Sequence, residues 1–311
     1  MKILVGLSGG VDSAVSAYLL KKTGHEVHAG FMINYLTDDP DCTTRADLEV
    51  AREVAAFLEI PFFTFDYREA YEARITSVIY EGYARGITPN PDVLCNNLIK
   101  FELFAAEARE YGYDKIATGH YAQIVDKKLL KGADSLKDQS YFLSRLSPEQ
   151  LAFALFPIGH LTKAQVREIA LDAGLPNALR RDSQGLCFIG KVKMQDFLGS
   201  RINDKYGDIL DTTGIKIGIH QGIHRYTIGQ RRGIEIGGGP ALFVLKKNAT
   251  DNTLIVGPEN APELLSRECT GSQWSSPSGV TIQELVSETL TAKIRYGQTD
   301  QSCRVLSISA Q

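Results

Sequence analysis

The sequence lacks a secretory signal pattern, a long apolar run and paired cysteines. Charged residues interrupt every hydrophobic stretch, so none is long enough to span a bilayer. We therefore expect a cytoplasmic protein with no membrane among its partners. The absence of any internal repeat or low-complexity tract argues against a solenoid. The five cysteines are an odd number without a C-x-x-C pair, which argues against a structural disulfide set and a zinc ribbon; they are Cys42, Cys95, Cys187, Cys269 and Cys303.

A glycine-rich turn follows the first apolar run, Ile3–Leu7, and precedes the apolar stretch Ala14–Leu20. The turn, SGGVDS at residues 8–13, is therefore expected between a buried strand and a helix. Its glycines allow close backbone approach, and the free amides of the opening helix turn point at an anion, so the turn is predicted to hold phosphate. It is not a Walker A sequence. It resembles the PP-loop, SGGxDS, whose enzymes cut ATP between the α and β phosphates. The alternative is a tight turn that binds nothing.

The chain of 311 residues predicts two or three domains. Up to residue 145, short apolar strands alternate with periodic helices, which predicts an α/β fold with a doubly wound parallel sheet that binds ligands at the carboxyl ends of its strands. Strands are expected at Ile3–Leu7, Val27–Ile33, Phe62–Phe65 and Lys115–Thr118; helices at Arg45–Leu58, Arg68–Arg85 and Leu98–Tyr111, with Thr44 and Asp47 as a variant capping pair.

The rest of the chain changes character twice. Residues 146–200 predict a small helical module that carries Cys187, with a capping box at Thr162 and Gln165. Residues 201–311 contain short β-runs separated by glycine and predict a β-barrel-like region. Strands are expected there at Ile215–Ile219, Ala241–Leu245, Thr253–Val256 and Thr291–Arg295. We therefore predict three domains, 1–145, 146–200 and 201–311.

Two cysteines lie in polar settings that favour chemistry over burial. Cys95 follows PNPDVL, a proline-flanked loop leading into a helix, with Asp92 three residues upstream as a candidate general acid or base. Cys187 lies in DSQGLCFIG after Arg180 and Arg181, and nearby cations favour a thiolate. The other three cysteines are interpreted as ordinary small side chains.

The net charge of −3 does not suggest a nucleic-acid-binding protein, but the charge is uneven. Residues 180–232 contain ten lysines and arginines against five aspartates, whereas residues 1–60 contain five against nine acidic residues. The basic region favours contact with a polyanion.

Six segments taken together carry a family resemblance: the PP-loop, PNPDVLCN, TGHYA, KDQSYFLS, DSQGLCFIG and YTIGQRRGI. In this order they closely resemble the bacterial tRNA-specific 2-thiouridylase (MnmA/TrmU) family over essentially the whole chain. The resemblance implies tRNA thiolation, in which sulfur replaces the C2 oxygen of the wobble uridine. It implies ATP as a co-substrate, tRNAs for Lys, Glu and Gln as substrates, no DNA, and a persulfide delivered by a sulfur-relay protein.

The same resemblance implies roles for individual residues. Cys95 is similar to the family's nucleophile and Cys187 to its persulfide carrier, while Asn90, Pro91 and Asp92 resemble residues that face the target base. The nucleotide site implied by the resemblance consists of Gly6, Leu7, Ser8, Gly9, Gly10, Val11, Asp12, Ser13, Met32 and Gly119. The implied tRNA contacts are His120, Lys137, Asp138, Gln139, Arg295 and Tyr296.

The chemistry follows from the unreactive C2 carbonyl, which ATP converts into an adenylate so that AMP can leave. The persulfide on Cys187 then attacks C2 or releases sulfide that does so, and Cys95 attacks the Cys187 sulfur, which leaves a transient disulfide between them. Mg²⁺ is expected to neutralise the phosphates, with Asp12 a candidate ligand or else a helix cap. The sequence leaves open whether an iron–sulfur cluster takes the place of the persulfide.

Members of the family usually continue into a further β-segment, so we expect the barrel of this chain, which stops at Gln311, to be incomplete. Two other functions compete with thiolation. A PP-loop ligase that adenylates a small molecule would explain only residues 1–30, and a non-catalytic RNA-binding or sulfur-carrier protein would not need the intact loop and both cysteines.

Overall fold

The structure, a computed structural model, describes residues 1–38, 42–181, 194–237 and 239–308. The chain divides into two compact units, each built from separated segments. The first comprises residues 1–71, 92–191 and 273–311, and the second comprises residues 72–91 and 192–272. The division into three domains at residues 145 and 200 stays a prediction.

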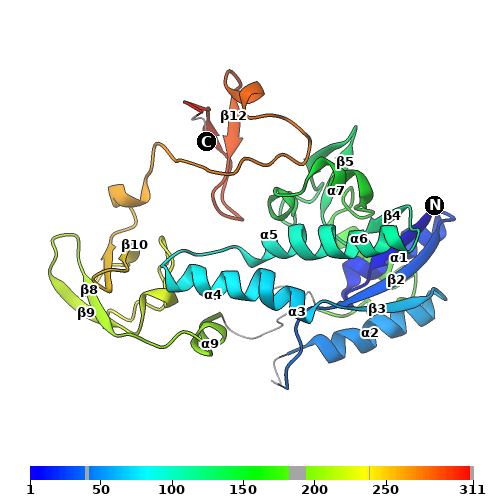
Figure 1. The fold of residues 1–311 in the computed structure, drawn as a ribbon, viewed down its shortest axis with the longest axis horizontal. Helices are drawn as coiled ribbons and strands as arrows, with labels where there is room; N and C mark the ends of the chain where they lie inside the picture. The colour runs from blue at the N-terminus through cyan, green and yellow to red at the C-terminus, as the bar shows by residue number, and fades with distance from the viewer. Residues whose placement is uncertain (39–41, 182–193, 238, 309–311) are drawn as a thin grey trace. The chain divides into compact units, whose positions relative to one another are not determined.

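The first unit contains a five-stranded parallel sheet in the order β3-β2-β1-β4-β7. Figure 1 labels β2, β3 and β4 of this sheet. Its strands are β1 (Lys2–Gly6), β2 (Glu26–Ile33), β3 (Phe62–Asp66), β4 (Lys115–Ala117) and β7 (Ala154–Leu155). The predicted α/β fold with a parallel sheet is confirmed. The fifth strand, β7, was not predicted, because two residues are too few to show a period.

Helices α1 (Val11–Lys22), α2 (Thr44–Phe57) and α8 (Lys163–Asp172) share one hydrophobic core with the sheet. Ile3 and Val5 of β1 point into this core, and Leu4 between them points to the other face, as the two-residue period of a strand requires. On that other face Phe104 lies against Gly30 of β2, where a β-carbon would be 2.7 Å from its ring. The sheet is therefore covered on both sides.

The remaining elements of this unit are short. One helical run consists of α5 (Pro91–Cys95), whose first residue belongs to the second unit, η2 (Asn96–Phe104) and α6 (Ala105–Glu110). Two hairpins pair β5 (Ala122–Val125) with β6 (Lys128–Lys131) and β12 (Leu290–Ala292) with β13 (Gln301–Cys303). Short helices follow at η3 (Ser140–Leu143), α7 (Pro148–Phe153) and η6 (Gln283–Leu285). Helix α3 (Arg68–Tyr71) ends the first segment and continues into η1 (Glu72–Thr76) and α4 (Ser77–Ala84).

Two local predictions need correction. Thr44 and Asp47 do not form the predicted capping pair, because the N-cap of α2 is Thr43 and it makes no side-chain cap. The Thr43 hydroxyl instead donates a hydrogen bond of 2.8 Å to Asp47, which also forms an ion pair with Arg180. The loop predicted before Cys95 is helical from Pro91 onward, since the missing N–H and fixed φ of proline suit the first helical turn. The capping box of Thr162 and Gln165 is confirmed.

The second unit contains a four-stranded sheet in the order β10-β11-β8-β9. Its strands are β8 (Gly207–Leu210), β9 (Lys216–His220), β10 (Phe243–Asn248) and β11 (Thr253–Gly257), with α9 (Met194–Gly199), η4 (Ile223–Arg225) and η5 (Pro262–Leu264) beside them. Ile209, Val244, Leu254 and Val256 form its core. Three of the four β-runs predicted after residue 201 are thus strands of this sheet, and the fourth, Thr291–Arg295, overlaps β12 of the first unit.

Candidate functional site

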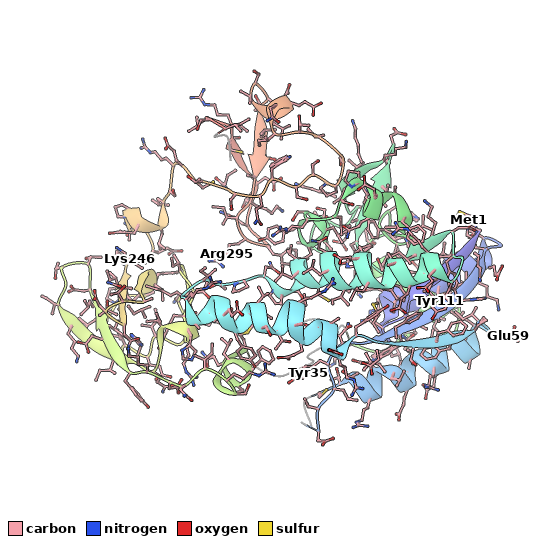
Figure 2. The ribbon with its side chains drawn as sticks, viewed as in Figure 1. Met1, Tyr35, Glu59, Tyr111, Lys246 and Arg295 are labelled. Carbon is pink, nitrogen blue, oxygen red and sulfur yellow. The ribbon has the colours of Figure 1, made fainter. Side chains whose placement is uncertain are left out.

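The carboxyl edge of the parallel sheet collects the predicted nucleotide residues. Figure 2 shows Met1, Glu59 and Tyr111, which come before β1, β3 and β4, at one end of these strands, and Tyr35, which follows β2, at the other. Residues 7–10 leave β1 at the Tyr35 end and enter α1. The sheet therefore presents the glycine-rich loop at the edge where parallel α/β sheets bind ligands.

The Ser13 hydroxyl makes hydrogen bonds within the loop. The Ser13 Oγ accepts a hydrogen bond of 3.1 Å from the Ser8 amide and donates one of 3.0 Å to the Gly10 carbonyl. Gly9 has φ of +79°, and Gly10 is the N-cap of α1 in extended conformation, without a side chain to cap the helix. The first amides of α1 have no partner within the helix, so they are available to an anion at this point.

Gly119, just after β4, lets the neighbouring backbone come close to the loop. A β-carbon there would lie 2.7 Å from the carbonyl carbon of Asp12 and 2.7 Å from the amide of Ser13. Met32 at the end of β2 lies beside β1, where a β-carbon on Gly6 would be 3.2 Å from its Cε. Gly6–Ser13, Met32 and Gly119, predicted from separate segments, therefore gather at one edge.

An ion pair that sequence reasoning missed lies at the first turn of α1. The Lys163 ammonium, from the start of α8, is 2.7 and 2.9 Å from the two carboxylate oxygens of Asp12. The Tyr121 hydroxyl donates a further hydrogen bond of 2.8 Å to the same carboxylate. Asp12 does not cap the helix, and its oxygens are engaged by these two partners.

A second set of contacts holds the loop at Gly9. Its carbonyl accepts hydrogen bonds from the Asn177 amide at 2.9 Å and from the Arg180 guanidinium at 3.0 Å. Arg180 also forms an ion pair with Asp47 of α2. Arg180 was predicted only as part of a basic region; no local pattern could place it 171 residues away from Gly9 in sequence.

Two buried amide side chains near this edge have unused hydrogen-bonding atoms. Asn34, which follows β2, is 1% exposed, and neither its Oδ1 nor its Nδ2 has a partner among the described residues. The Oδ1 of Asn177, whose Nδ2 bonds Gly9, likewise has no partner in the described part of the chain. Because buried polar atoms are normally paired, these atoms are candidates for hydrogen bonds to a ligand.

The predicted catalytic residues are only partly described. Cys95 is the last residue of α5 and is 0% exposed, while Asp92 lies one turn earlier and is half-buried. Asn90 and Pro91 come directly before them. Cys187 lies outside the described residues, so the pairing of Cys95 with Cys187 stays a prediction. Lys191 and Lys193, two of the ten cations counted in residues 180–232, also lie outside them.

The residues predicted to touch tRNA fall into two groups. His120 and Asp138 are buried: the His120 Nδ1 is 2.7 Å from the Thr118 hydroxyl, and burial lowers the pKa of His120 well below 6.5, so the ring is neutral. Asp138 accepts hydrogen bonds from the Gly132 amide and the Ser140 hydroxyl, each at 2.9 Å. These two side chains therefore have structural partners inside the unit.

The other tRNA candidates lie nearer the surface. The side-chain Oε1 of Gln139 accepts a hydrogen bond from the Tyr121 backbone amide at 3.0 Å, and Lys137 is half-buried. Arg295, labelled in Figure 2, and Tyr296 lie in the turn between β12 and β13. Tyr296 is 47% exposed, and its ring centroid is 4.5 Å from that of Phe142.

Several cations of the basic region are already paired within their own unit. Arg225 makes two hydrogen bonds of 2.8 Å to Asp204, which lower the pKa of that carboxyl, and Lys216 is 2.6 Å from Asp208. Arg231 and Arg232 are exposed. The count of basic residues therefore overstates the charge that this region presents to a polyanion.

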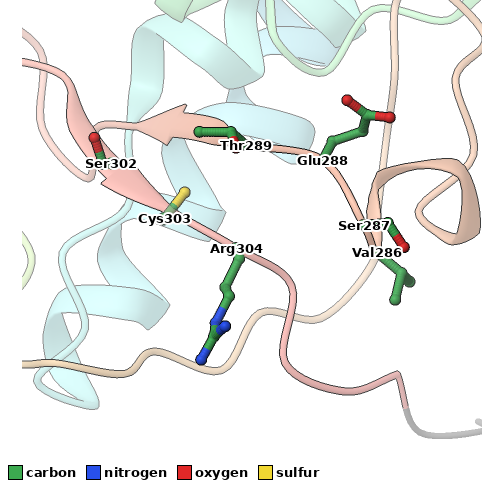
Figure 3. Close-up of a pocket in the computed structure, with 7 residues that line it drawn as sticks. All are labelled: Val286, Ser287, Glu288, Thr289, Ser302, Cys303 and Arg304. Carbon is green, nitrogen blue, oxygen red and sulfur yellow. The ribbon is translucent and has the colours of Figure 1, made fainter.

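A surface hollow lies apart from the loop. It has a volume of about 560 Å³ and is lined by residues around the β12–β13 hairpin, among them Glu288, Cys303 and Arg304 (Figure 3). It contains none of the predicted site residues, and we assign no chemistry to it. Among the described residues, no group of three or more His, Cys, Asp or Glu could hold a metal ion, and no helix is long and apolar enough to cross a membrane.

Comparison with known proteins gives matches along most of the chain. The family model described as the tRNA methyl transferase HUP domain matches residues 1–191, and that described as the tRNA methyl transferase PRC-barrel domain matches residues 195–258. This chain is 47% identical to the protein named tRNA-specific 2-thiouridylase MnmA from Akkermansia muciniphila and 44% identical to the protein of the same name from Leptothrix cholodnii. These alignments cover 84% and 99% of this chain and 76% and 86% of those proteins.

Solved structures are more distant. The NMN synthetase from Francisella tularensis is 22% identical, with a TM-score of 0.40 over 64% of this chain and 72% of that one. The predicted β-rich region agrees with the barrel-domain match and with the four-stranded sheet of residues 207–257.

Proposed function

The chain belongs to the family of tRNA-specific 2-thiouridylases, and we propose that it uses ATP to replace the C2 oxygen of the wobble uridine in tRNA by sulfur. The observation that carries the proposal is the braced glycine-rich loop at the carboxyl edge of the sheet, with Met32 and Gly119 beside it. The match to relatives over 99% of the chain supports tRNA as the substrate. Tyr296 and Arg295 on the hairpin turn are proposed tRNA contacts.

The first step is an ATP-pyrophosphatase reaction. The C2 oxygen of uridine attacks the α-phosphorus, the bond from that phosphorus to the bridging oxygen breaks, and pyrophosphate leaves with the electron pair. The free amides at the start of α1 and the glycines of residues 8–13 hold the phosphates during this step. The product is a uridine adenylate from which AMP is a good leaving group.

The second step transfers sulfur to C2. A persulfide on Cys187 attacks C2 and displaces AMP, or releases sulfide that does so. In either route the Cys95 thiolate attacks the Cys187 sulfur, frees the terminal sulfur and leaves a Cys95–Cys187 disulfide, which an external thiol reductant must reduce before the next turnover. Cys95 is fully buried in this structure, so this step requires its sulfur to become accessible. Asp92 is the proposed acid or base for the transferred proton.

Mg²⁺ is proposed to accompany ATP, bound to its phosphates; without ATP, both Asp12 oxygens are engaged by Lys163. The proposed substrates are the tRNAs for Lys, Glu and Gln, and the proposed sulfur donor is a persulfide-carrying relay protein. Such an enzyme acts in the cytoplasm.

The test measures ATP cleavage with and without unmodified tRNA-Lys, separates AMP and pyrophosphate from ADP, and then assays 2-thiouridine after a persulfide donor is added. We expect AMP only with tRNA, and no thiolation in Cys187→Ser or Cys95→Ser. Cys269→Ser, which removes an exposed thiol, is the matched control and keeps activity. AMP formation without tRNA would indicate a small-molecule ligase, and tRNA binding without cleavage a non-catalytic protein. If the wild-type protein contains stoichiometric iron and the Cys95 variant does not, an iron–sulfur cluster takes the place of the persulfide in the mechanism.

A further inference from the structure

Lys163 places a positive charge beside the glycine-rich loop, which has no basic residue of its own. Residues 6–13 contain no lysine or arginine, whereas the polyphosphate of ATP carries several negative charges. The Lys163 ammonium lies at Asp12, next to Ser13, whose hydroxyl bonds the loop at Ser8 and Gly10. The cation is thus within one residue of the loop's own hydrogen-bond network.

The backbone of Lys163 is fixed although its side chain is long. It is the first residue of α8, whose start is held by the capping box of Thr162 and Gln165. Its amide donates a hydrogen bond of 2.9 Å to Asp134, and this bond lowers the pKa of the Asp134 carboxyl. A fixed base with four rotatable methylene groups lets the ammonium change partners while the helix stays in place.

Asp12 holds the ammonium at the loop without burying it. The Lys163 and Asp12 side chains are 15% and 31% exposed, so the ion pair borders solvent at the open side of the site. Arg180, a second cation at the loop, is bound to the Gly9 carbonyl and to Asp47, so it supports the backbone. The Lys163 ammonium instead contacts the Asp12 carboxylate.

We propose that the Lys163 ammonium binds the β and γ phosphates of ATP and neutralises pyrophosphate as it leaves, with Asp12 holding the ammonium in place before ATP arrives. This inference rests on the proposed cleavage between the α and β phosphates. As the bond to the α-phosphorus breaks, the electron pair stays on the β-phosphate oxygen, and the positive charge beside it stabilises that anion. The lysine acts through its charge, and no proton transfer is part of this step.

Asn34 gives independent support for a nucleotide at this edge. Its buried amide has both a donor and an acceptor without partners in the described chain, which is the chemistry that pairs with an adenine edge. It follows β2, the strand next to β1. A base held near β2 and phosphates at the loop would place the β and γ phosphates over the start of α1, on the side of Asp12.

The experiment compares the binding of ATP, AMP and inorganic pyrophosphate by calorimetry at one Mg²⁺ concentration, with full-length wild type, Lys163→Met and Lys163→Arg. We expect Lys163→Met to weaken ATP and pyrophosphate about ten- to a hundredfold, the range for a lost charged hydrogen bond, and AMP less than about twofold. Lys163→Arg keeps the charge and recovers part of the loss. Lys22→Met, which removes an equal charge from the last turn of the same helix α1, controls for net charge and leaves all three ligands unchanged.

The binding data separate a phosphate contact of Lys163 from a purely structural role. Equal weakening of ATP and AMP in Lys163→Met would show that the ion pair only braces the loop, and unchanged ATP and pyrophosphate binding would refute the contact; either overturns the inference while the proposed function stands. Wild-type protein that binds none of the three ligands would instead refute the proposed function. Loss of binding for ATP and pyrophosphate alone, with AMP retained, supports the inference.

Discussion

Replacing Gly9 by alanine should damage the loop far more than the same change at the next residue, Gly10. Gly9 has φ of +79°, a conformation that costs a residue with a β-carbon about 1–2 kcal/mol. The new β-carbon would also lie 2.5 Å from the Asp47 carbonyl oxygen and 2.9 Å from the Arg180 guanidinium. Since the first of these is a backbone atom of α2 and cannot move alone, overpacking adds about 1–3 kcal/mol.

The total expected loss for Gly9→Ala is therefore about 2–5 kcal/mol, a large part of the roughly 5–15 kcal/mol by which native proteins are stable. Gly10 has φ of −78°, and its nearest neighbour to a β-carbon would be the Ser8 hydroxyl at 3.4 Å. For Gly10→Ala the lower entropy of the unfolded chain offsets the poorer N-cap, which leaves stability within about 1 kcal/mol of wild type.

Urea unfolding followed by circular dichroism measures both variants, and hydrogen exchange in peptides from β1 and α1 locates the effect. Faster exchange should be confined to these elements and to α2. A Gly9→Ala protein as stable as wild type, or a Gly10→Ala protein equally destabilised, would refute the steric reasoning.

Three further outcomes are expected. His120 is neutral in the folded protein and takes up a proton when the protein unfolds, so the free energy of unfolding should decrease by up to about 1.4 kcal/mol per pH unit as the pH falls below 6.5. The variant His120→Gln should lose this part of the pH dependence in urea titrations at several pH values. An unchanged pH dependence would contradict the burial argument. Asn34→Ala should leave the ligand-free protein as stable as wild type yet shrink the rise in melting temperature that ATP causes, since its amide has no partner to lose among the described residues; an equal rise would exclude ligand contact. Tyr296→Ala should weaken tRNA binding by about 1–3 kcal/mol in filter binding and Tyr296→Phe much less, if the exposed ring stacks on a base; equal losses would point to the hydroxyl instead.

Features fixed by neighbouring residues could be predicted from the sequence. The β1 strand, the glycine-rich turn and α1 were expected as a unit, because apolar runs and glycines determine them within about 20 residues. The capping box of Thr162 and Gln165 is equally local, with two hydrogen bonds across three residues. The helix before Cys95 was missed, since PNP was interpreted as a rigid loop although proline at Pro91 is compatible with a first helical turn.

Features fixed by tertiary contacts could not be predicted in this way. Lys163 meets Asp12 across 151 residues, and Arg180 meets Asp47 across 133 residues. Neither pair has a period or spacing that a sequence shows. The same holds for His120, which the family resemblance offered as a tRNA contact and which the fold encloses between the rings of Phe101 and Phe156.

Two ion pairs lie at the loop of this chain, whose net charge is −3. A lone cation beside the loop would be costly to desolvate, and Asp12 and Asp47 offset that cost for Lys163 and Arg180 before ligand arrives. The two pairs differ in what fixes the cation: Arg180 is bonded to the loop backbone, whereas the described hydrogen bonds of the Lys163 ammonium go to a carboxylate that phosphate can replace. Phosphate binding at Lys163 would exchange one anionic partner of the ammonium for another, and the Asp12 carboxylate would then keep the hydrogen bond from the Tyr121 hydroxyl.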